Sequence, residues 1–153
     1  MNLACDSDLP FNSVPYEVVI PLPLRIQRTK AKMWSLNLNL YRNTYHRSLN
    51  TLKQNYKDIV MKQLREMEVP QLQACKLRFK VFAKDKRRFD IANITSVVEK
   101  FAVDGMVEYG MIRDDNYYYV RGSSCCFGGF DKQNPRCEMR ITEVPLDDYP
   151  TFN

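Results

Sequence analysis

The chain has 153 residues, of which 44% are hydrophobic and 27% are charged, a balance typical of one globular domain that buries its core without staples. Its apolar stretches are far shorter than the roughly 20 residues that a membrane-spanning helix requires, so a soluble protein with no membrane partner is expected. We expect residues 1–14 to be a flexible N-terminal segment and residues 15–153 to form a single domain.

Charge is segregated along the chain. Residues 25–88 carry 17 Lys or Arg and 4 acidic side chains, a local net charge of +13, whereas residues 89–153 carry 6 basic and 11 acidic side chains, a local net charge of −5. A basic half beside an acidic half suits a phosphate-binding face next to carboxylates that bind a divalent metal. Two solvated faces of an ordinary domain also explain the pattern.

The five cysteines include no Cys-x-x-Cys pair, and no secretory cleavage site follows an apolar run. We therefore expect reduced thiols and a cytoplasmic location. The adjacent Cys125 and Cys126 could suggest zinc or redox chemistry, but tetrahedral zinc needs wider ligand spacing with histidine support. His46 is the only histidine, so the cysteines are expected to be structural.

In chain order, the first expected element is a β-branched strand over residues 16–20, which ends at Pro21. Residues 25–43 lack clean periodicity, although residues 36–41 alternate apolar and polar side chains as a half-buried strand or extended segment does. From residue 45 to residue 68, apolar side chains recur every three or four positions. This spacing predicts a long amphipathic helix.

The second half of the chain continues with an alternating strand over residues 76–82. A basic turn over residues 84–90 leads into a second helix that ends near Gly110. Further strands are expected over residues 117–121 and 138–144, joined by a turn at Gly128-Gly129. The order predicts an α/β or α+β fold, with a small mixed sheet of about four strands packed against two main helices.

Polar side chains surround the second helix. At 100° per residue, Asn93, Lys100 and Asp104 share one face, while Asp90 precedes the helix and Asp114-Asp115 follows it. Each feature has an ordinary explanation. Asp90 suits a helix N-cap, Lys100 and Asp104 suit an i, i+4 pair, and the two adjacent aspartates suit a turn.

A cluster of cations lies directly upstream of Asp90, formed by Lys84, Lys86, Arg87 and Arg88. Phosphodiester hydrolysis needs cations that hold the anionic backbone and carboxylates that hold Mg²⁺, which activates water and stabilises the charge on the phosphoryl group. Both sets occur side by side here. Their combination favours a nuclease site over a collection of separate structural roles.

These residues resemble the core motif of the RusA-like Holliday-junction resolvases of phages and prophages. That motif is a basic run, an Asp-x-Asp-Asn that opens a helix, a Lys and an Asp spaced by four, a Gly, and an Asp-Asp pair. The segment Asn37–Arg42 is also similar to the family's entry motif, and the resemblance covers roughly residues 16–144. The matching residues are Arg87-Arg88, Asp90-Ile91-Ala92-Asn93, Lys100, Asp104, Gly110 and Asp114-Asp115.

The resemblance implies a homodimeric, Mg²⁺-dependent endodeoxyribonuclease, with Mn²⁺ as a substitute, that nicks four-way junctions in phage DNA recombination, repair or packaging. Asp90 and Asp115 would be catalytic metal ligands, Lys100 would meet the phosphate or the attacking water, and Asp114 would support the metal. A phage-encoded protein of this kind acts in the host cytoplasm. Contacts to branched DNA are expected from Arg28, Lys30, Lys32, Arg42, Lys84, Lys86, Arg87, Arg88 and Asn93.

Two features depart from the family pattern. Ala92 replaces the second aspartate of the opening motif and cannot bind metal, and the helix is one turn longer between Asn93 and Lys100. Asp104 is the better replacement ligand, because Glu99 lies about 240° around the helix from Asn93 and is expected in solvent. The hypothesis is a metal site made of Asp90, Asp104, Asp114 and Asp115.

Among the aromatic residues, Trp34 and Tyr41 are expected to touch DNA or a dimer partner, and Tyr117–Tyr119 are expected in the core and at a sheet edge. Three functions remain open. They are a junction-selective endonuclease, a RusA-derived DNA- or protein-binding inhibitor that lost cleavage with Ala92, and an interaction module whose basic half binds an acidic host protein.

Overall fold

The computed structural model describes residues 14–146, so the expectations for residues 1–13, including Cys5, and for residues 147–153 lie outside the described residues. The elements in chain order are β1 (Glu17–Leu22), β2 (Arg25–Thr29), β3 (Lys32–Ser35), α2 (Leu38–Asn43), α3 (His46–Glu66), β4 (Ala74–Ala83), α4 (Ile91–Tyr109), β5 (Val120–Phe130) and β6 (Arg136–Val144). The mixed α+β fold predicted from the sequence is confirmed. Both long helices lie within two residues of their expected limits.

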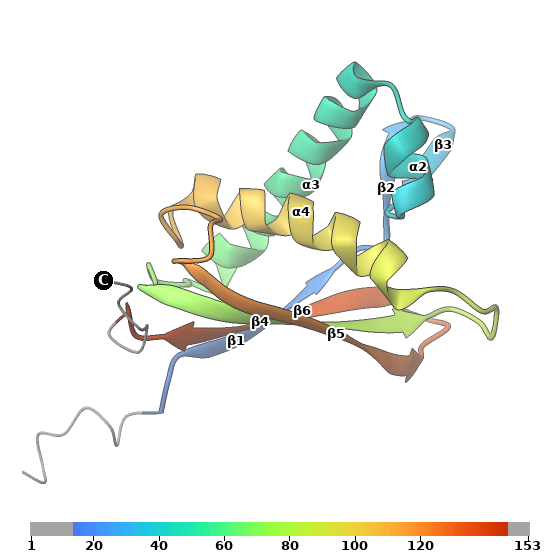
Figure 1. Cartoon of the computed structure of the whole chain (residues 1–153). Coiled ribbons are helices and arrows are strands. Elements are labelled where there is room, and N and C mark those ends of the chain that lie inside the picture. Colours follow the sequence, from blue (N-terminus) through green and yellow to red (C-terminus); the bar gives the residue numbers. More distant parts are fainter. Residues whose placement is uncertain (1–13, 147–153) are drawn as a thin grey trace, which may run out of the picture.

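A four-stranded sheet in the order β1-β6-β4-β5 forms the base of the molecule (Figure 1). Strand β6 runs antiparallel to both β1 and β4, whereas β5 runs parallel to β4. Parallel neighbours need a long crossover connection, and α4 supplies it. Strands β2 and β3 form a separate antiparallel hairpin that precedes α2.

Helices α3 and α4 cover one face of the sheet (Figure 1). Apolar side chains of both helices share one buried cluster with alternate residues of β4 and β6, because successive strand residues point to opposite faces. The core side of α3 is made of Leu52, Tyr56, Val60 and Leu64. Tyr56 has no exposed surface, and its hydroxyl donates a 2.9 Å hydrogen bond to the Pro23 carbonyl that leads from β1 into β2.

Three local expectations are wrong. Residues 38–43 form helix α2 rather than a strand, because the Asn37 side chain accepts a hydrogen bond from the Leu40 amide and caps the helix. Residues 117–119 form a turn, and β5 begins only at Val120. Gly128-Gly129 lies inside β5, which continues to Phe130 beside β4.

Trp34 is buried, which contradicts its expected contact with DNA or a dimer partner. Its ring stacks on Phe101 of α4 at a centroid separation of 6.1 Å, and its indole N–H donates to Thr44 Oγ1 at 3.1 Å. A buried indole commonly satisfies its N–H in this way. Trp34 thus fastens the β2–β3 hairpin to α4.

The described cysteines are all free thiols, as expected. Burial raises the pKa of both Cys75 and Cys137 to about 12, and thiols with such pKa values are inert at neutral pH. Cys125 is exposed and Cys126 is half-buried on β5. Within residues 14–146, no helix has the length and apolar character needed to span a bilayer.

Replacing Tyr56 by Phe is expected to lower the free energy of unfolding by about 1 kcal/mol, because the partly buried Pro23 carbonyl loses its donor. Urea denaturation measures this loss. The matched control is Tyr45→Phe, at a side chain that is 59% exposed. An equal loss in the two variants would show that the hydrogen bond from Tyr56 to Pro23 contributes nothing.

Thiol labelling checks the burial of the cysteines. In a Cys5→Ser variant of the native protein at pH 8, Cys125 is expected to react promptly, whereas Cys75 and Cys137 stay unreactive because their thiolate fractions are minute. Labelling in concentrated guanidinium is the control in which every thiol reacts. Rapid modification of Cys75 in the native protein would contradict the buried position of β4.

Candidate functional site

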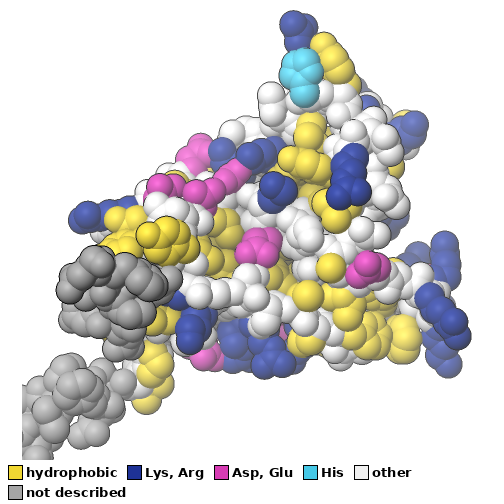
Figure 2. All heavy atoms as spheres, viewed as in Figure 1, with side chains coloured by type: hydrophobic (Ala, Val, Ile, Leu, Met, Phe, Trp, Pro, Cys, Tyr) yellow, Lys and Arg dark blue, Asp and Glu magenta, His cyan; other side chains and the backbone are white. Residues whose placement is uncertain are grey.

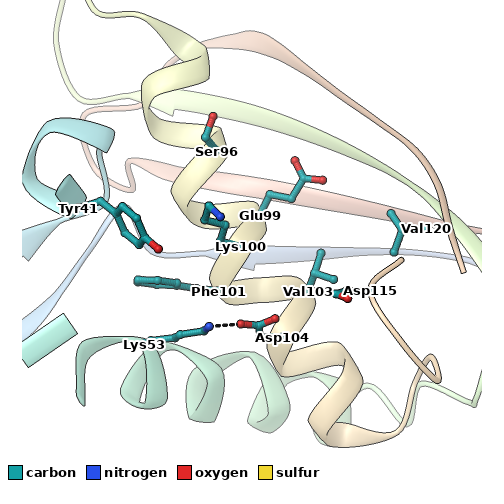
Figure 3. A pocket seen from close by; sticks show the side chains of 10 residues that line it. All are labelled: Tyr41, Lys53, Ser96, Glu99, Lys100, Phe101, Val103, Asp104, Asp115 and Val120. Carbon is teal, nitrogen blue, oxygen red and sulfur yellow. Dashed lines mark ion pairs between the residues drawn. The ribbon is translucent and has the colours of Figure 1, made fainter. Parts of the chain in front are cut away.

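A cleft of about 560 Å³ opens along the exposed flank of α4 (Figure 3). Helices α2 and α3 and the chain that leads into β5 complete its walls. It is lined by Tyr41, Lys53, Ser96, Glu99, Lys100, Phe101, Val103, Asp104, Asp115 and Val120. Three of the predicted site residues, Lys100, Asp104 and Asp115, therefore meet in one place although up to 15 positions separate them along the sequence.

Asp90 begins α4 and does not line this cleft. Its carboxylate accepts a 3.0 Å hydrogen bond from the Ala92 amide, which is the ordinary geometry of a helix N-cap. The same helix ends at Gly110, whose φ of 90° lies in the left-handed region that glycine adopts without strain. Both ends of this helix therefore lie where the sequence predicts them.

Lys100 and Asp104 share a flank of α4 but do not form an ion pair with each other. Asp104 is instead ion-paired with Lys53 of α3, whereas the Lys100 ammonium lies 5.9 Å from the centre of the Tyr41 ring. Figure 3 shows the Lys100 side chain directed toward Tyr41 and the Lys53–Asp104 pair across the base of the cleft. Lys100 is exposed and can therefore meet an anionic ligand.

The two adjacent aspartates have different roles in the loop after α4. The Asp114 carboxylate accepts from the Asp115 amide at 2.8 Å and from the Asn116 side-chain amide at 2.9 Å, so it stabilises a turn. Asp115 lines the cleft. The geometry thus separates a turn-forming carboxylate from one that faces the candidate site.

Glu99 is the residue that sequence reasoning set aside. It is half-buried and lines the cleft together with Asp115, which corrects the expectation that it lies in solvent. The helical wheel placed Glu99 correctly relative to Asn93, but it carried no information about the loop that returns along this side of α4. Lys53 was also missed, because its basic character alone did not distinguish it from the other cations of α3.

The four-carboxylate magnesium site is not assembled within one chain. Val103 of the cleft lies 13 residues beyond Asp90, about 20 Å along a helix axis, and Asp115 follows the opposite end of α4 from Asp90 (Figure 1). Within residues 14–146, no group of three or more His, Cys, Asp or Glu side chains is placed to hold a metal ion. Asp90 therefore does not join Asp115 in a ligand group of this kind.

The cleft nevertheless fits a more open kind of magnesium site. Mg²⁺ is usually bound by one or two carboxylates together with waters and substrate phosphates. Glu99 and Asp115 both line the cleft, and neither forms an ion pair within the described chain. The donor set suits a Mg²⁺ ion that keeps several water ligands, and it does not suit a closed cage of protein ligands.

The cations predicted to bind DNA lie outside the cleft, in two groups. Lys84, Lys86, Arg87 and Arg88 are exposed in the connection from β4 to α4, where Lys and Arg side chains gather at one end of the molecule (Figure 2). Within this group, hydrogen bonding from the Arg87 backbone amide, together with its guanidinium, lowers the pKa of Asp85. The second group is on the β2–β3 hairpin and α2 and consists of Arg28, Lys30, Lys32 and Arg42.

Asn93 occupies the first turn of α4, where it is half-buried and its backbone amide donates to the Asp90 carbonyl. It is not among the residues that line the cleft.

Comparisons with protein-family models and with curated proteins found no match for this chain. The case for a function therefore depends on the residues and their arrangement.

A double-mutant cycle tests whether Asp104 is available for chemistry. Lys53 and Asp104 have side chains that are 38% and 29% exposed, so solvent screens their attraction. We expect a coupling energy below about 1 kcal/mol from urea denaturation of Lys53→Gln, Asp104→Asn and the double variant. A coupling of about 3 kcal/mol or more would instead make Asp104 a structural ion-pair partner.

Proposed function

We propose that this chain binds branched DNA and nicks it in a Mg²⁺-dependent reaction at the α4 cleft, as RusA-like resolvases do. The observation that supports this function best is the meeting of Lys100, Asp104 and Asp115 in one cleft. These are residues that the resemblance marks for phosphate contact and metal binding. The proposal includes a homodimer that acts on four-way junctions in the cytoplasm, with Mn²⁺ able to replace Mg²⁺.

In the proposed reaction, the cations and carboxylates of the cleft have separate tasks. Lys100, whose ammonium is exposed above Tyr41, binds the phosphate that is to be cleaved. Glu99 and Asp115 would hold the Mg²⁺ ion from the protein side, with Asp104 nearby on its pair with Lys53. A bound Mg²⁺ ion supplies charge stabilisation and an activated water at the phosphate.

The exposed cations at the β4–α4 connection and on the β2–β3 hairpin would hold the DNA arms beside the cleft. Contacts of Lys and Arg with phosphates release counterions, so the affinity they provide falls steeply with salt. The basic residues 84–88 stand at the N-terminal end of α4, where the helix dipole also favours an anion. Both effects support a backbone contact at that end of the molecule.

Binding without cleavage is the second candidate, and two observations favour it. Ala92 offers no ligand, and Asp90 caps the N-terminus of α4 outside the cleft that Asp115 lines. A protein that retained only the cations would bind junctions tightly in a salt-sensitive manner and leave them uncut. The two candidates share the DNA partner and differ in the chemistry at the cleft.

The deciding experiment incubates the protein with a labelled synthetic four-way junction or a matched linear duplex, in EDTA, Mg²⁺ or Mn²⁺. We expect nicked junction with either metal and none in EDTA. Asp115→Asn should abolish nicking, and Lys100→Met should lower the rate by about 100-fold, as the loss of one electrostatic partner of the transition state does. Junction binding should persist in both variants.

The matched controls are Asp58→Asn and Glu66→Gln on α3, which remove carboxylates outside the cleft. Tight junction binding without nicking in every metal would exclude cleavage and support the second candidate, as would nicking that appears only in Ala92→Asp. Equal affinity for junction and linear duplex would exclude selectivity for branched DNA, and binding to neither DNA would favour the third function, an interaction module whose basic half binds an acidic host protein.

A further inference from the structure

The second face of the sheet, opposite α3 and α4, carries a row of cations that the α4 cleft does not use. In the described structure no helix covers this face (Figure 1). Side chains alternate across a strand, so every second residue of β4 and β6 points outward here, opposite the buried Leu77, Phe79 and Met139. The outward cations are Lys76, Arg78, Lys80, Arg136 and Arg140.

Only part of this positive charge is neutralised by the protein. Arg140 is ion-paired with Glu17 of β1, and Arg136 is ion-paired with Glu138 and Asp131. Within residues 14–146, the three β4 cations Lys76, Arg78 and Lys80 form no ion pair with a carboxylate. We call these three residues the β4 cation row.

One member of the row lies opposite another cation. Arg78 of β4 lies directly opposite Arg140 of β6 in the antiparallel register, and both side chains point to the open face. Like charges at opposed positions of two strands destabilise a sheet. Arg140 is ion-paired with Glu17, and Lys80 lies opposite Glu138 in the same register. The pairing of Arg78 with Arg140 therefore adds no stability to the sheet, and a bound anion would relieve its repulsion.

Small side chains on β5 leave the sheet face beside the row accessible. Gly122 and Ser124 lie in register with Lys76 and Arg78. Farther along β5, a Cβ at Gly128 would come within 2.6 Å of the Lys80 side chain and 2.9 Å of the Phe82 ring. Glycine therefore gives the Lys80 stem its place across β5.

Two shallow hollows on this face share Arg78 and Arg140. The larger, of about 400 Å³, extends from Lys76 across Gly122 and Ser124 to Thr142. The smaller, of about 220 Å³, extends past Lys80 and Glu138 to Val19. Figure 2 shows Lys and Arg side chains gathered along this underside of the sheet.

We propose that this open sheet face binds the phosphate backbone of duplex DNA through the β4 cation row. Alternate residues of a strand stand about 6.7 Å apart, which gives a linear array of charges suited to a linear polyanion. The two hollows contain no aromatic side chain and no Met. Their Arg side chains suit protein and phosphate partners alike, so the linear row of cations is what favours a phosphate backbone. The inference uses the DNA partner of the proposed function but does not require cleavage at the α4 cleft.

The test compares the native chain with a variant that carries Lys76→Gln, Arg78→Gln and Lys80→Gln. Binding to a fluorescent linear duplex is measured in EDTA over a series of salt concentrations. Each phosphate contact contributes about 0.9 to the slope of log affinity against log salt, so the variant's slope should be shallower by about 2–3. At low salt, the affinity should fall by at least about 10-fold.

The matched control removes the same charge elsewhere, with Lys62→Gln, Arg65→Gln and Arg113→Gln, three exposed positions away from the sheet face. Its slope should stay within one unit of the native slope. Equal urea midpoints for the two triple variants confirm that both are folded. An unchanged slope in the β4 variant, or the same change in the control, overturns the inference.

Sedimentation of the native chain and the β4 variant without DNA separates DNA binding from self-association. A native assembly that dissociates in the variant, together with an unchanged salt slope, would identify the face as a contact between copies and contradict the inference. Because EDTA prevents nicking, a protein that never cuts junctions but shows the expected slope change would contradict only the proposed function.

Discussion

The burial of Phe101 fixes the rotation of α4, and the arrangement of the cleft depends on that rotation. Its ring packs against three other aromatic rings. The centroid separations are 6.1 Å to Trp34 of the hairpin, 5.8 Å to Tyr56 of α3 and 6.2 Å to Tyr41 of α2. With position 101 held inward, position 100 must lie about 100° around the helix axis. The aromatic core thus sets the direction of Lys100 and, one turn later, that of Asp104.

The crossover from β4 through α4 to β5 sets the second constraint. Because β5 runs parallel to β4, the chain must return along the length of the sheet before β5 starts, and the two ends of α4 lie far apart. Asp90 is placed at one end and the Asp114-Asp115 pair follows the other. The topology separates carboxylates that a linear motif presents as one set.

Much of the fold is predictable from local patterns, because one-sided burial leaves a period of two in strands and of three to four in helices. This is why α3, α4 and β4 match their expected ranges. Helix α2 was misread because LNLNLY alternates like a strand, whereas the Asn37 cap that decides its conformation acts through a single side chain. The predicted range of β5 is too short because its glycines resemble a turn signal, although β4 pairs with β5 along most of its length.

The site was predictable in part, for a different reason. Helix periodicity placed Lys100 and Asp104 on one flank, but the inclusion of Glu99 and Lys53 in the cleft depends on how the loop 110–119 and α3 pack against that helix. Such contacts join residues that are distant in sequence, and the periodicity of a single sequence reports only local structure. The outward row on β4 was visible as alternation, but its lack of a covering layer was not.

The pairing of β1 with β6 has a consequence for biosynthesis. Glu17–Leu22 is the first described strand, and its sheet partner, Cys137–Thr142, belongs to the last. A ribosome releases the chain from its N-terminus, so β1 must wait for nearly the whole of the described chain before it can pair. During that interval, the backbone groups of β1 are exposed to other nascent chains or to chaperones. The pairing of β1 with β6 is therefore a late step of folding after synthesis, and it ends the exposure of the unpaired backbone groups of β1.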